Sequence, residues 1–101
     1  LAESLPKMSD GGKVLTIPIK KGVLFQDDPC FVKTGGKGRE LVAEDVIYTL
    51  KRIADPALMS PSFWLLDGMI EGLNEWRDEG RRSGRADYSK PIEGLRAIDP
   101  Y

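Results

Sequence analysis

The chain offers few residues that could do chemistry. It contains no histidine and one cysteine, Cys30. Histidine is the commonest general base, the usual partner of a nucleophilic serine or cysteine, and the commonest zinc ligand. One cysteine cannot build an internal disulfide framework or a cysteine zinc site. Without an activating neighbour, we interpret Cys30 as a passive thiol or a partly buried small apolar residue. The sequence therefore predicts no catalytic residue, no metal site and no cofactor.

Two pairs of adjacent carboxylates are the next candidates for chemistry. Asp27 and Asp28 could hold a hard cation such as Ca²⁺, but that ion takes about six to eight oxygen ligands and no calcium-loop spacing follows. We interpret them as turn residues. Glu44 and Asp45 could form an acid-base pair, but neighbouring side chains on a helix point in different directions. Their place at the start of a predicted helix explains them better, because acidic side chains stabilise a helix N-terminus.

A glycine-rich tract, Gly35-Gly36-Lys37-Gly38, resembles part of a phosphate-binding loop. That loop has the pattern Gly-x-x-x-x-Gly-Lys followed by Ser or Thr, between a strand and a helix. Here Arg39 takes the place of the hydroxyl residue, and no strand is predicted before the tract. We interpret the tract as a plain flexible loop.

The charged residues exclude some classes of partner. Fifteen Lys and Arg nearly balance sixteen Asp and Glu, for a net charge of -1. A nucleic-acid binder needs a surplus of positive charge, and a membrane-surface module needs a polybasic patch. One local cluster mixes both signs and consists of Arg81, Arg82, Arg85, Asp78, Glu79 and Asp87. Mixed signs indicate a solvated loop and not an anion site, so we expect no nucleic-acid partner.

Three aromatic residues, Phe63, Trp64 and Trp76, could form a stacking surface that faces a ligand. Aromatic side chains at helical spacing more often pack in a core, and we interpret these three as core residues. Some of them would be exposed if the rest of a longer protein normally covers them.

The first part of the chain is predicted to be extended. An irregular lead-in comes first, followed by a turn at residues 9–12, where Asp and Gly are typical turn residues. In Val14–Ile19, side chains alternate between two faces, with Leu15, Ile17 and Ile19 on one of them, which is typical of a strand. Pro18 has no amide proton and should therefore lie at an edge or a bulge. Val23–Phe25 is a second, shorter extended stretch, and Gln26–Glu40 reads as a long loop.

The clearest predicted element is a helix over Ala43–Ala54. Acidic residues stand in its first turn, and Lys51 and Arg52 stand in its last turn, so both ends complement the helix dipole. Pro56 ends the helix soon afterwards. Its apolar residues fall on one face at helical spacing and are Ala43, Val46, Ile47, Leu50, Ile53 and Ala54. This pattern is typical of an amphipathic helix.

A second helix is predicted to begin with Ser60 as its cap and Pro61 at its first position. Its apolar side would consist of Phe63, Trp64, Leu66, Met69, Ile70 and Leu73. Gly68 and Gly72 weaken it, so it could break there. Residues 74–82 could continue as a polar helix. After a polar, mobile loop over Ser83–Lys90, Leu95–Ile98 reads as a final short strand.

The order of these elements is strand, short strand, loop, helix, helix and strand. It predicts an α+β fold, with a small β-sheet and two or three helices laid against it. The length suits one domain, so residues 1–101 are expected to form a single unit with a thin core. Such a core predicts marginal stability or association through uncovered apolar surface. No apolar run approaches the about 20 residues needed to span a bilayer.

Short blocks of residues run through nearly the whole chain in a fixed order. They are Leu1-Ala2-Glu3-Ser4, Ser9-Asp10-Gly11-Gly12-Lys13, Thr16-Ile17-Pro18-Ile19-Lys20-Lys21-Gly22-Val23-Leu24-Phe25, Ala43-Glu44-Asp45-Val46, Lys51-Arg52-Ile53-Ala54-Asp55-Pro56 and Gly94-Leu95-Arg96-Ala97-Ile98-Asp99. Each block alone is a weak signal, but at this spacing the set resembles the bacterial extracellular solute-binding proteins of family 5, the oligopeptide- and nickel-binding kind. The chain departs from the family pattern at Pro18, Asp28 and Val42, and in the loop over residues 29–40, which is longer than the family's compact turn.

The resemblance implies a longer, exported parent protein, built of two lobes around a ligand cleft, of which residues 1–101 are a fragment of one lobe. Such a protein is not an enzyme. It works in the periplasm or outside the cell, associated with the membrane, and delivers peptides or another small solute to the membrane subunits of an ABC importer. No ligand-binding residue of the family can be matched to a position in this chain, and peptide, nickel complex and sugar all stay open as ligands.

Two other functions remain as alternatives. The chain could be an independent protein–protein interaction module whose apolar helix face meets a partner. It could also be an enzyme, which the missing histidine and the missing catalytic motif disfavour.

Overall fold

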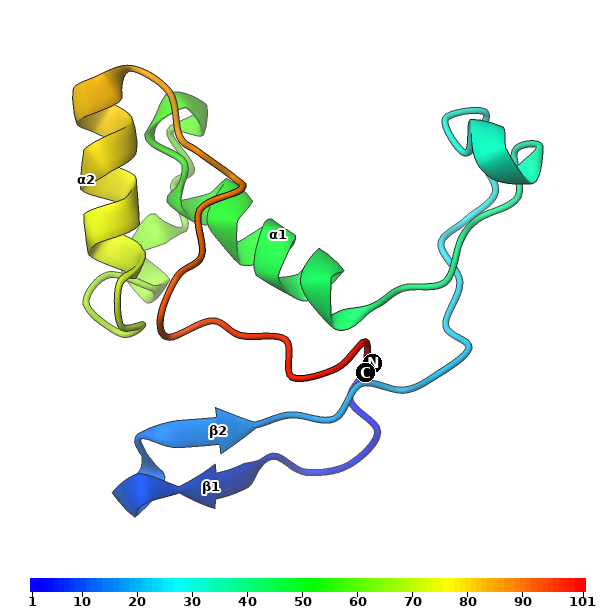
Figure 1. Cartoon of the computed structure of the whole chain (residues 1–101), viewed down its shortest axis with the longest axis horizontal. Helices are drawn as coiled ribbons and strands as arrows, with labels where there is room; N and C mark the ends of the chain where they lie inside the picture. Colours follow the sequence, from blue (N-terminus) through cyan, green and yellow to red (C-terminus); the bar gives the residue numbers. More distant parts are fainter. The chain divides into compact units, whose positions relative to one another are not determined.

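Figure 1 shows the computed structural model, which describes residues 1–101. The chain forms two compact units. The first, here called the hairpin unit, comprises Leu1–Ala43 and Asp99–Tyr101; the second, here called the helical unit, comprises Glu44–Ile98. The helical unit is therefore inserted into the sequence of the hairpin unit. Together the units contain one two-stranded sheet and two α-helices, which confirms the predicted α+β class.

A short β-hairpin opens the hairpin unit. Strand β1, Lys7–Ser9, pairs antiparallel with β2, Val14–Thr16, so that Met8 lies opposite Leu15. The turn between them is a 3₁₀ turn over Asp10–Gly12, whose three residues all have positive φ, from 51° to 86°. Glycine adopts this conformation without strain, which explains the two glycines in the turn. The predicted turn is thus confirmed, whereas the sequence does not predict β1, which runs from the end of the lead-in to Ser9 at the start of the turn.

The predicted strand over Val14–Ile19 is right only in its first half. After β2 the chain leaves the ladder, and Ile19 forms one isolated bridge with Ala2. Pro18 cannot donate a backbone hydrogen bond, and its carbonyl accepts one from the amide of Glu3 at 2.9 Å. A proline at this point explains why the ladder stops short of Ile19.

Residues 23–41 form a paired segment, here called the arm. Leu24 bridges Glu40, and the Phe25 amide donates to the Arg39 carbonyl at 2.9 Å. Farther out, the Asp28 amide donates to the Gly36 carbonyl at 2.9 Å, beside a 3₁₀ turn over Val32–Thr34. Figure 1 shows the two sides of the arm running next to each other up to this turn. The long loop predicted for residues 26–40 is therefore confirmed, and it is ordered by its own backbone hydrogen bonds.

Helix α1 spans Ala43–Ala54, with the bounds that the sequence predicted. Its acidic first turn and basic last turn are present as expected. Asp55 then caps a 3₁₀ turn over Pro56–Leu58, because its carboxylate accepts a hydrogen bond from the Ala57 amide at 2.9 Å.

Helix α2 spans Leu73–Ser83, so the prediction of a helix beginning at Ser60 and Pro61 is wrong. Residues 60–72 form turns, with one 3₁₀ turn over Phe63–Leu65. Gly68 and Gly72 have φ of 70° and 81°, a left-handed conformation that a right-handed helix cannot contain. The polar continuation predicted over residues 74–82 is the part that is helical.

Residues 84–92, here called the strap, follow α2 without a helix or a strand of their own (Figure 1). The predicted strand over Leu95–Ile98 is wrong. Only one isolated bridge forms there, between Ile92 and Leu95, and Ile98 is 83% exposed. A strand needs a neighbour along its length to satisfy its backbone groups, and none lies beside these residues.

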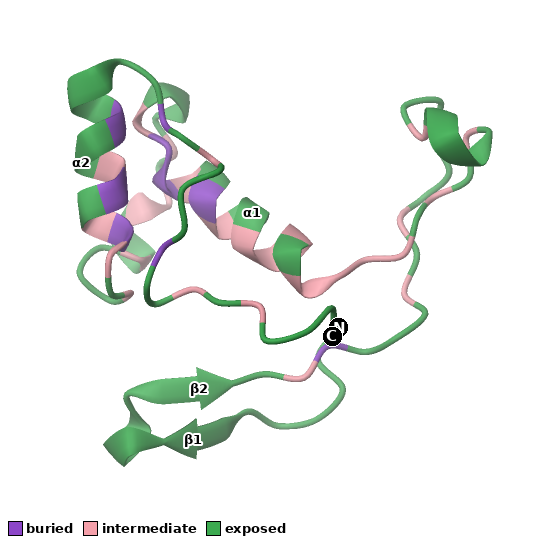
Figure 2. Ribbon diagram, viewed as in Figure 1, coloured by how far each residue is buried: buried purple, intermediate pink, exposed green.

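The core lies in the helical unit and joins four separate segments. Its buried residues are Ala54, Leu73, Trp76, Ala86 and Ile92. Phe63, Leu66, Ile70, Tyr88 and Leu95 pack against them and are partly buried. Figure 2 shows these buried positions on α1, α2 and the strap, whereas β1 and β2 are exposed throughout. In the hairpin unit only Ile19 is a buried apolar residue. Neither α-helix combines the length and the apolar character that crossing a membrane requires.

Candidate functional site

The carboxylate of Glu40 connects distant parts of the hairpin unit. Its Oε1 accepts a hydrogen bond from the Gly22 amide at 2.6 Å, and its Oε2 accepts one from the Tyr101 hydroxyl at 2.8 Å. Lys21 Nζ lies 5.3 Å from the centre of the Tyr101 ring. Glu40 therefore joins three segments that are far apart in the sequence.

These contacts shift the pKa values of both partners in opposite directions. The Gly22 amide, followed by the Tyr101 hydroxyl, lowers the pKa of Glu40 below its ordinary value. The hydrogen bond to Glu40 raises the pKa of Tyr101, because an ionised phenol could no longer donate it. At neutral pH Glu40 stays charged and Tyr101 stays neutral. Neither group is poised to exchange a proton there, so the pair suits fastening better than acid–base catalysis.

An open depression of about 790 Å³ lies beside this junction. Its lining consists of Glu3, Pro18, Ile19, Lys20, Lys21, Asp99, Pro100 and Tyr101. Backbone hydrogen bonds hold the floor together, since the Ile19 amide donates to the Tyr101 carbonyl at 2.6 Å and the Lys20 amide donates to the Leu1 carbonyl at 2.9 Å. The rim carries charges of both signs, so it can offer polar contacts to a small solute. It contains no nucleophile beside a base.

The two adjacent aspartates of the arm are engaged within the arm. Asp27 accepts hydrogen bonds from the Gly38 amide at 2.9 Å and from Lys37 Nζ at 3.1 Å, which lower its pKa. Asp28 accepts one from the Cys30 amide at 2.8 Å, which lowers its pKa. Asp28 thus serves a local turn, as the sequence suggested, whereas Asp27 joins the two sides of the arm. No group of three or more Cys, Asp or Glu side chains in the chain is arranged to hold a metal ion.

The glycine tract lies on the returning side of the arm, and no helix begins directly after it. Gly38 is required there for a steric reason. A Cβ atom at this position would lie 1.7 Å from the Phe25 carbonyl oxygen, far inside contact distance. The Phe25 ring is in turn covered by the Arg39 guanidinium, 4.8 Å from the ring centre. The tract therefore closes the arm and does not form a cradle at a helix N-terminus.

Cys30 is exposed, so the expectation of partial burial is wrong for this residue. The hydrogen bond to the Asp28 carboxylate raises the pKa of its thiol above the ordinary value. A raised pKa disfavours the nucleophilic thiolate, in keeping with a passive thiol.

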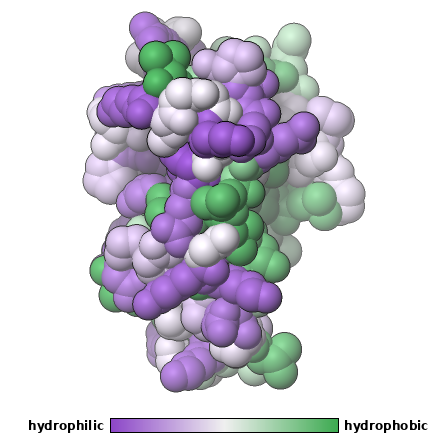
Figure 3. All heavy atoms as spheres, turned by 90° about the vertical axis from the view of Figure 1, so that its right-hand side faces the viewer, coloured by the Kyte–Doolittle hydropathy of each residue, from purple (hydrophilic) through white to green (hydrophobic).

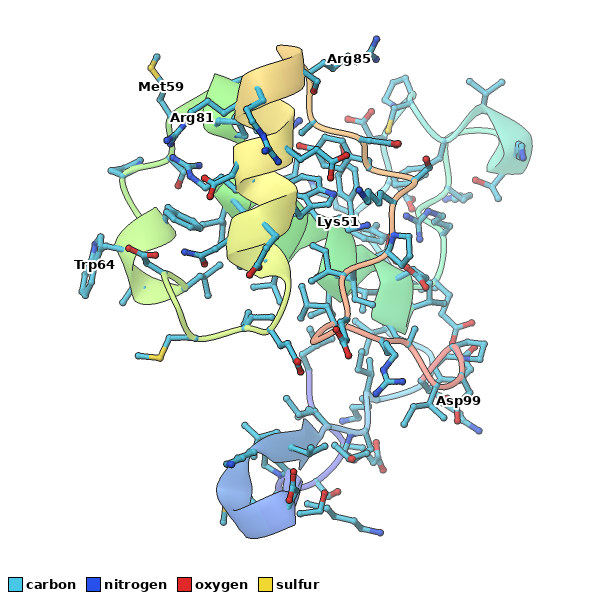
Figure 4. The ribbon with its side chains drawn as sticks, turned by 60° about the vertical axis from the view of Figure 1, so that its left-hand side comes forward. Lys51, Met59, Trp64, Arg81, Arg85 and Asp99 are labelled. Carbon is cyan, nitrogen blue, oxygen red and sulfur yellow. The ribbon has the colours of Figure 1, made fainter.

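The three aromatic residues separate into different environments. Trp76 is a core residue, 4% exposed, and Phe63 packs against the core while the Arg77 guanidinium lies 4.2 Å from its ring centre. Trp64 is 72% exposed, so its prediction as a core residue is wrong. Because residues 60–72 form turns and not a helix, the ring of Trp64 does not share the face of its neighbours. Figure 4 shows it projecting away from the ribbon.

The arginine cluster does not form one loop. Arg81 and Arg82 stand in the last turn of α2, and only Arg85 follows the Gly84 that ends the helix. All three side chains are exposed, so the predicted solvation is right although the predicted loop is wrong for two of them.

The sequence missed a buried polar cluster in the helical unit, made of Lys51, Asp55 and Tyr88 and here called the clasp. Lys51 Nζ donates to the carbonyls of Tyr88 and Lys90, each at 2.9 Å, and the Tyr88 hydroxyl donates to Asp55 Oδ2 at 2.6 Å. Lys51 and Asp55 are each only 7% exposed. The available signal was their spacing of one helical turn at the end of α1, next to the apolar face. Burial, followed by the bond to Asp55, raises the pKa of Tyr88 to about 12.

The whole chain, residues 1–101, matches a family model described as bacterial extracellular solute-binding proteins, family 5 middle. No curated protein and no solved structure matches the chain significantly. Proteins of this family bind solutes in ABC import, are typically periplasmic or extracellular, and are normally not enzymes. The match covers the blocks from which the resemblance was inferred, and it covers the hairpin unit and the helical unit alike. The chain therefore belongs to family 5 of the bacterial extracellular solute-binding proteins.

Proposed function

We propose that this chain is part of one lobe of a protein that captures peptides, or similar small solutes, outside the cytoplasmic membrane and passes them to the membrane subunits of an ABC importer. The observation that carries the proposal is the family match over residues 1–101. In this proposal the chain is a scaffold, and the ligand is enclosed together with parts of the protein that lie outside residues 1–101.

The use of the ionisable side chains supports a scaffold over a catalyst. Glu40 and Tyr101 bind each other and backbone groups of the hairpin unit. Lys51 and Asp55 bind the strap, within the helical unit. These side chains join segments of the chain and leave no pair of groups converging on an open cavity, which is what acid–base or nucleophilic catalysis needs. In this proposal the protein therefore binds its solute and releases it unchanged.

A thermal-shift screen of the complete product of the gene tests the proposal. Short peptides, nickel chelates and oligosaccharides are compared at equal concentration. We expect short peptides to raise the melting temperature, because a ligand that binds only the folded state stabilises it. If no class of solute raises the melting temperature, solute capture is overturned. If only chelates or sugars raise it, the peptide assignment is overturned. Mass spectrometry of the recovered peptide completes the test, since cleavage would contradict a non-enzymatic role.

A further inference from the structure

The strap is held on the helical unit largely by side chains of other segments. Its residues 84–92 have no ladder and no helix to satisfy their backbone groups. Lys51 of α1 donates to the carbonyls of Tyr88 and Lys90, and Trp76 Nε1 of α2 donates to the carbonyl of Asp87 at 2.9 Å. Side chains from both helices thus supply the hydrogen bonds that a neighbouring strand would otherwise give.

The Lys51 ammonium group is buried without a carboxylate partner. The ion pairs Lys37–Asp27 and Lys90–Glu79 do not include Lys51. Its partners are two neutral carbonyls and the face of the Trp76 ring, 5.9 Å from Nζ. Desolvating a cation is unfavourable, and neutral acceptors offset this less than an opposite charge would. Lys51 also helps to lower the pKa of Asp87, so an opposite charge lies near it, although outside ion-pair distance. The clasp therefore offsets the desolvation of Lys51 less than an ion pair would, although every buried polar side-chain atom has a partner.

Apolar contacts anchor the strap mainly toward its two ends. Ala86 and Ile92 are buried in the core at 6% and 2% exposure. Between them, Tyr88 is only partly buried, with its ring edge-on to Trp76 at 5.5 Å and tilted against Tyr48 at 5.3 Å. Figure 4 shows Lys51 lying between α2 and the strap. The middle of the strap thus depends on the clasp more than its ends do.

We propose that the strap is a local opening device: its middle, residues 87–90, detaches while α1 and α2 stay folded, and the clasp sets how often this happens. Segments with few buried apolar contacts and little regular structure open at lower free energy than the helices beside them. Opening releases the Asp87 carbonyl from the Trp76 indole and uncovers one edge of that ring. The inference does not depend on the proposed function.

Amide hydrogen exchange of the 101-residue chain tests the device through a matched pair of variants. Tyr88→Phe removes the hydroxyl that binds Asp55, whereas Tyr48→Phe removes a half-exposed hydroxyl that makes no hydrogen bond in the structure. We expect Tyr88→Phe to speed exchange of the Ser89 and Lys90 amides about fivefold, the effect of one lost hydrogen bond. Amides in the middle of α1 should keep their rates, and Tyr48→Phe should change neither set. Lys51→Met should act as Tyr88→Phe does, with a larger change.

The contrast between the two sets of amides decides the outcome. If α1 and the strap speed up by the same factor in Tyr88→Phe, the clasp acts only on global unfolding and the proposal is overturned. Unchanged strap amides in Tyr88→Phe overturn it as well, and this holds even if Lys51→Met fails to fold. A second readout uses Trp64→Phe as the background, so that Trp76 is the only tryptophan. There, Tyr88→Phe should increase acrylamide quenching of Trp76 at a denaturant concentration too low to unfold α1.

Discussion

Lys51 illustrates what an individual residue does in this protein. Its position in the last turn of α1 gives it the role that the sequence suggested, a positive charge near the helix C-terminus. In the structure its ammonium group also reaches carbonyls 37 and 39 residues farther along the chain. Glu40 behaves similarly, since its hydroxyl partner Tyr101 lies 61 residues away. Ionisable side chains here fasten distant segments of the same unit.

Alkaline pH tests this role at Tyr88. Its folded-state pKa of about 12 lies above the ordinary value of 10.0, so its contribution to stability is complete below pH 10 and is lost as pH rises through about 12. Tyr88→Phe should lower the free energy of unfolding by about 1 kcal/mol at neutral pH, through the lost hydrogen bond. When the pH is raised from about 9 to about 11, the free energy of unfolding should fall less for the Tyr88→Phe variant than for the unmodified chain. Urea unfolding at both pH values measures the difference, and an equal alkaline loss in both proteins would show that Tyr88 titrates normally.

At the residue scale, local pattern predicted the turn role of Asp28 and the acidic start of α1, because Asp28 binds the amide two residues farther on and the acidic residues act on their own helix end. The clasp and the contacts of Glu40 with Gly22 and Tyr101 could not be predicted, because each depends on a partner many residues away. No periodicity in the sequence reports such a distance. The prediction that Trp64 is a core residue is wrong for a related reason. Apolar spacing alone does not distinguish a helix from a series of turns, and only a helix would place its ring on the core side.

At the scale of elements, α1 and residues 60–72 differ in how much of their structure is local. Helix α1 has apolar periodicity, complementary charges at both ends and a proline after it, and all of these agree. Residues 60–72 have similar apolar spacing, but two glycines take the left-handed conformation and prevent a helix. The apolar side chains of Leu66 and Ile70 still pack against the core. Their predicted contact with the core is therefore right, although the predicted helix is wrong.

The contact between α2 and the strap leads to a prediction at this scale. Gly80 of α2 is buried, and a Cβ atom there would lie 3.0 Å from Ala86 Cα and 3.2 Å from Ala86 Cβ. Alanine favours a helix over glycine by about 1 kcal/mol, but overpacking a buried contact costs about 1–3 kcal/mol. Gly80→Ala should therefore destabilise the chain by up to about 2 kcal/mol in urea unfolding.

A double-mutant cycle provides the control. Ala86→Gly removes the Ala86 Cβ, one of the atoms that Gly80→Ala would crowd, so the two changes together should be milder than the sum of the single changes by at least about 0.5 kcal/mol. Additive losses would mean that α2 and the strap do not crowd each other at this contact.

At the scale of the whole molecule, the family and the α+β class could be predicted, whereas the place of the core could not. The order and spacing of the short blocks can be read directly from the sequence, and the family match extends over the same residues. Burial depends on which distant segments meet, and Ala86 and Ile92 had no local sign of being core residues. The candidate ligand contacts could not be predicted at all, because no residue of this chain matched a known contact position of the family.

Exposed apolar side chains support the expectation of association. Five of them fall within residues 58–69, namely Leu58, Met59, Trp64, Leu65 and Met69, with exposed fractions from 43% to 82%. Figure 4 shows Met59 and Trp64 pointing outward, and Figure 3 shows further apolar atoms exposed among hydrophilic ones on another face. Such surface is a common cause of self-association when nothing covers it.

Replacing the two most prominent of these side chains tests the expectation. The double variant Met59→Ser and Trp64→Ser should reduce association of the 101-residue chain in sedimentation velocity. Its melting temperature should change little, because substitutions of exposed side chains usually alter the free energy of unfolding by only about 0.5 kcal/mol. The same concentration-dependent mass for the variant and the unmodified chain would place the cause of association elsewhere.

Titration calorimetry with a peptide selected by the thermal-shift screen tests the central claim, that residues 1–101 are a scaffold within a solute-binding protein. The complete gene product and the isolated 101-residue chain are titrated side by side, with circular dichroism confirming that both are folded. The account predicts saturable binding heat for the complete product and none for the isolated chain. Saturable heat with the isolated chain would contradict the scaffold role, and no heat with either protein would contradict peptide capture.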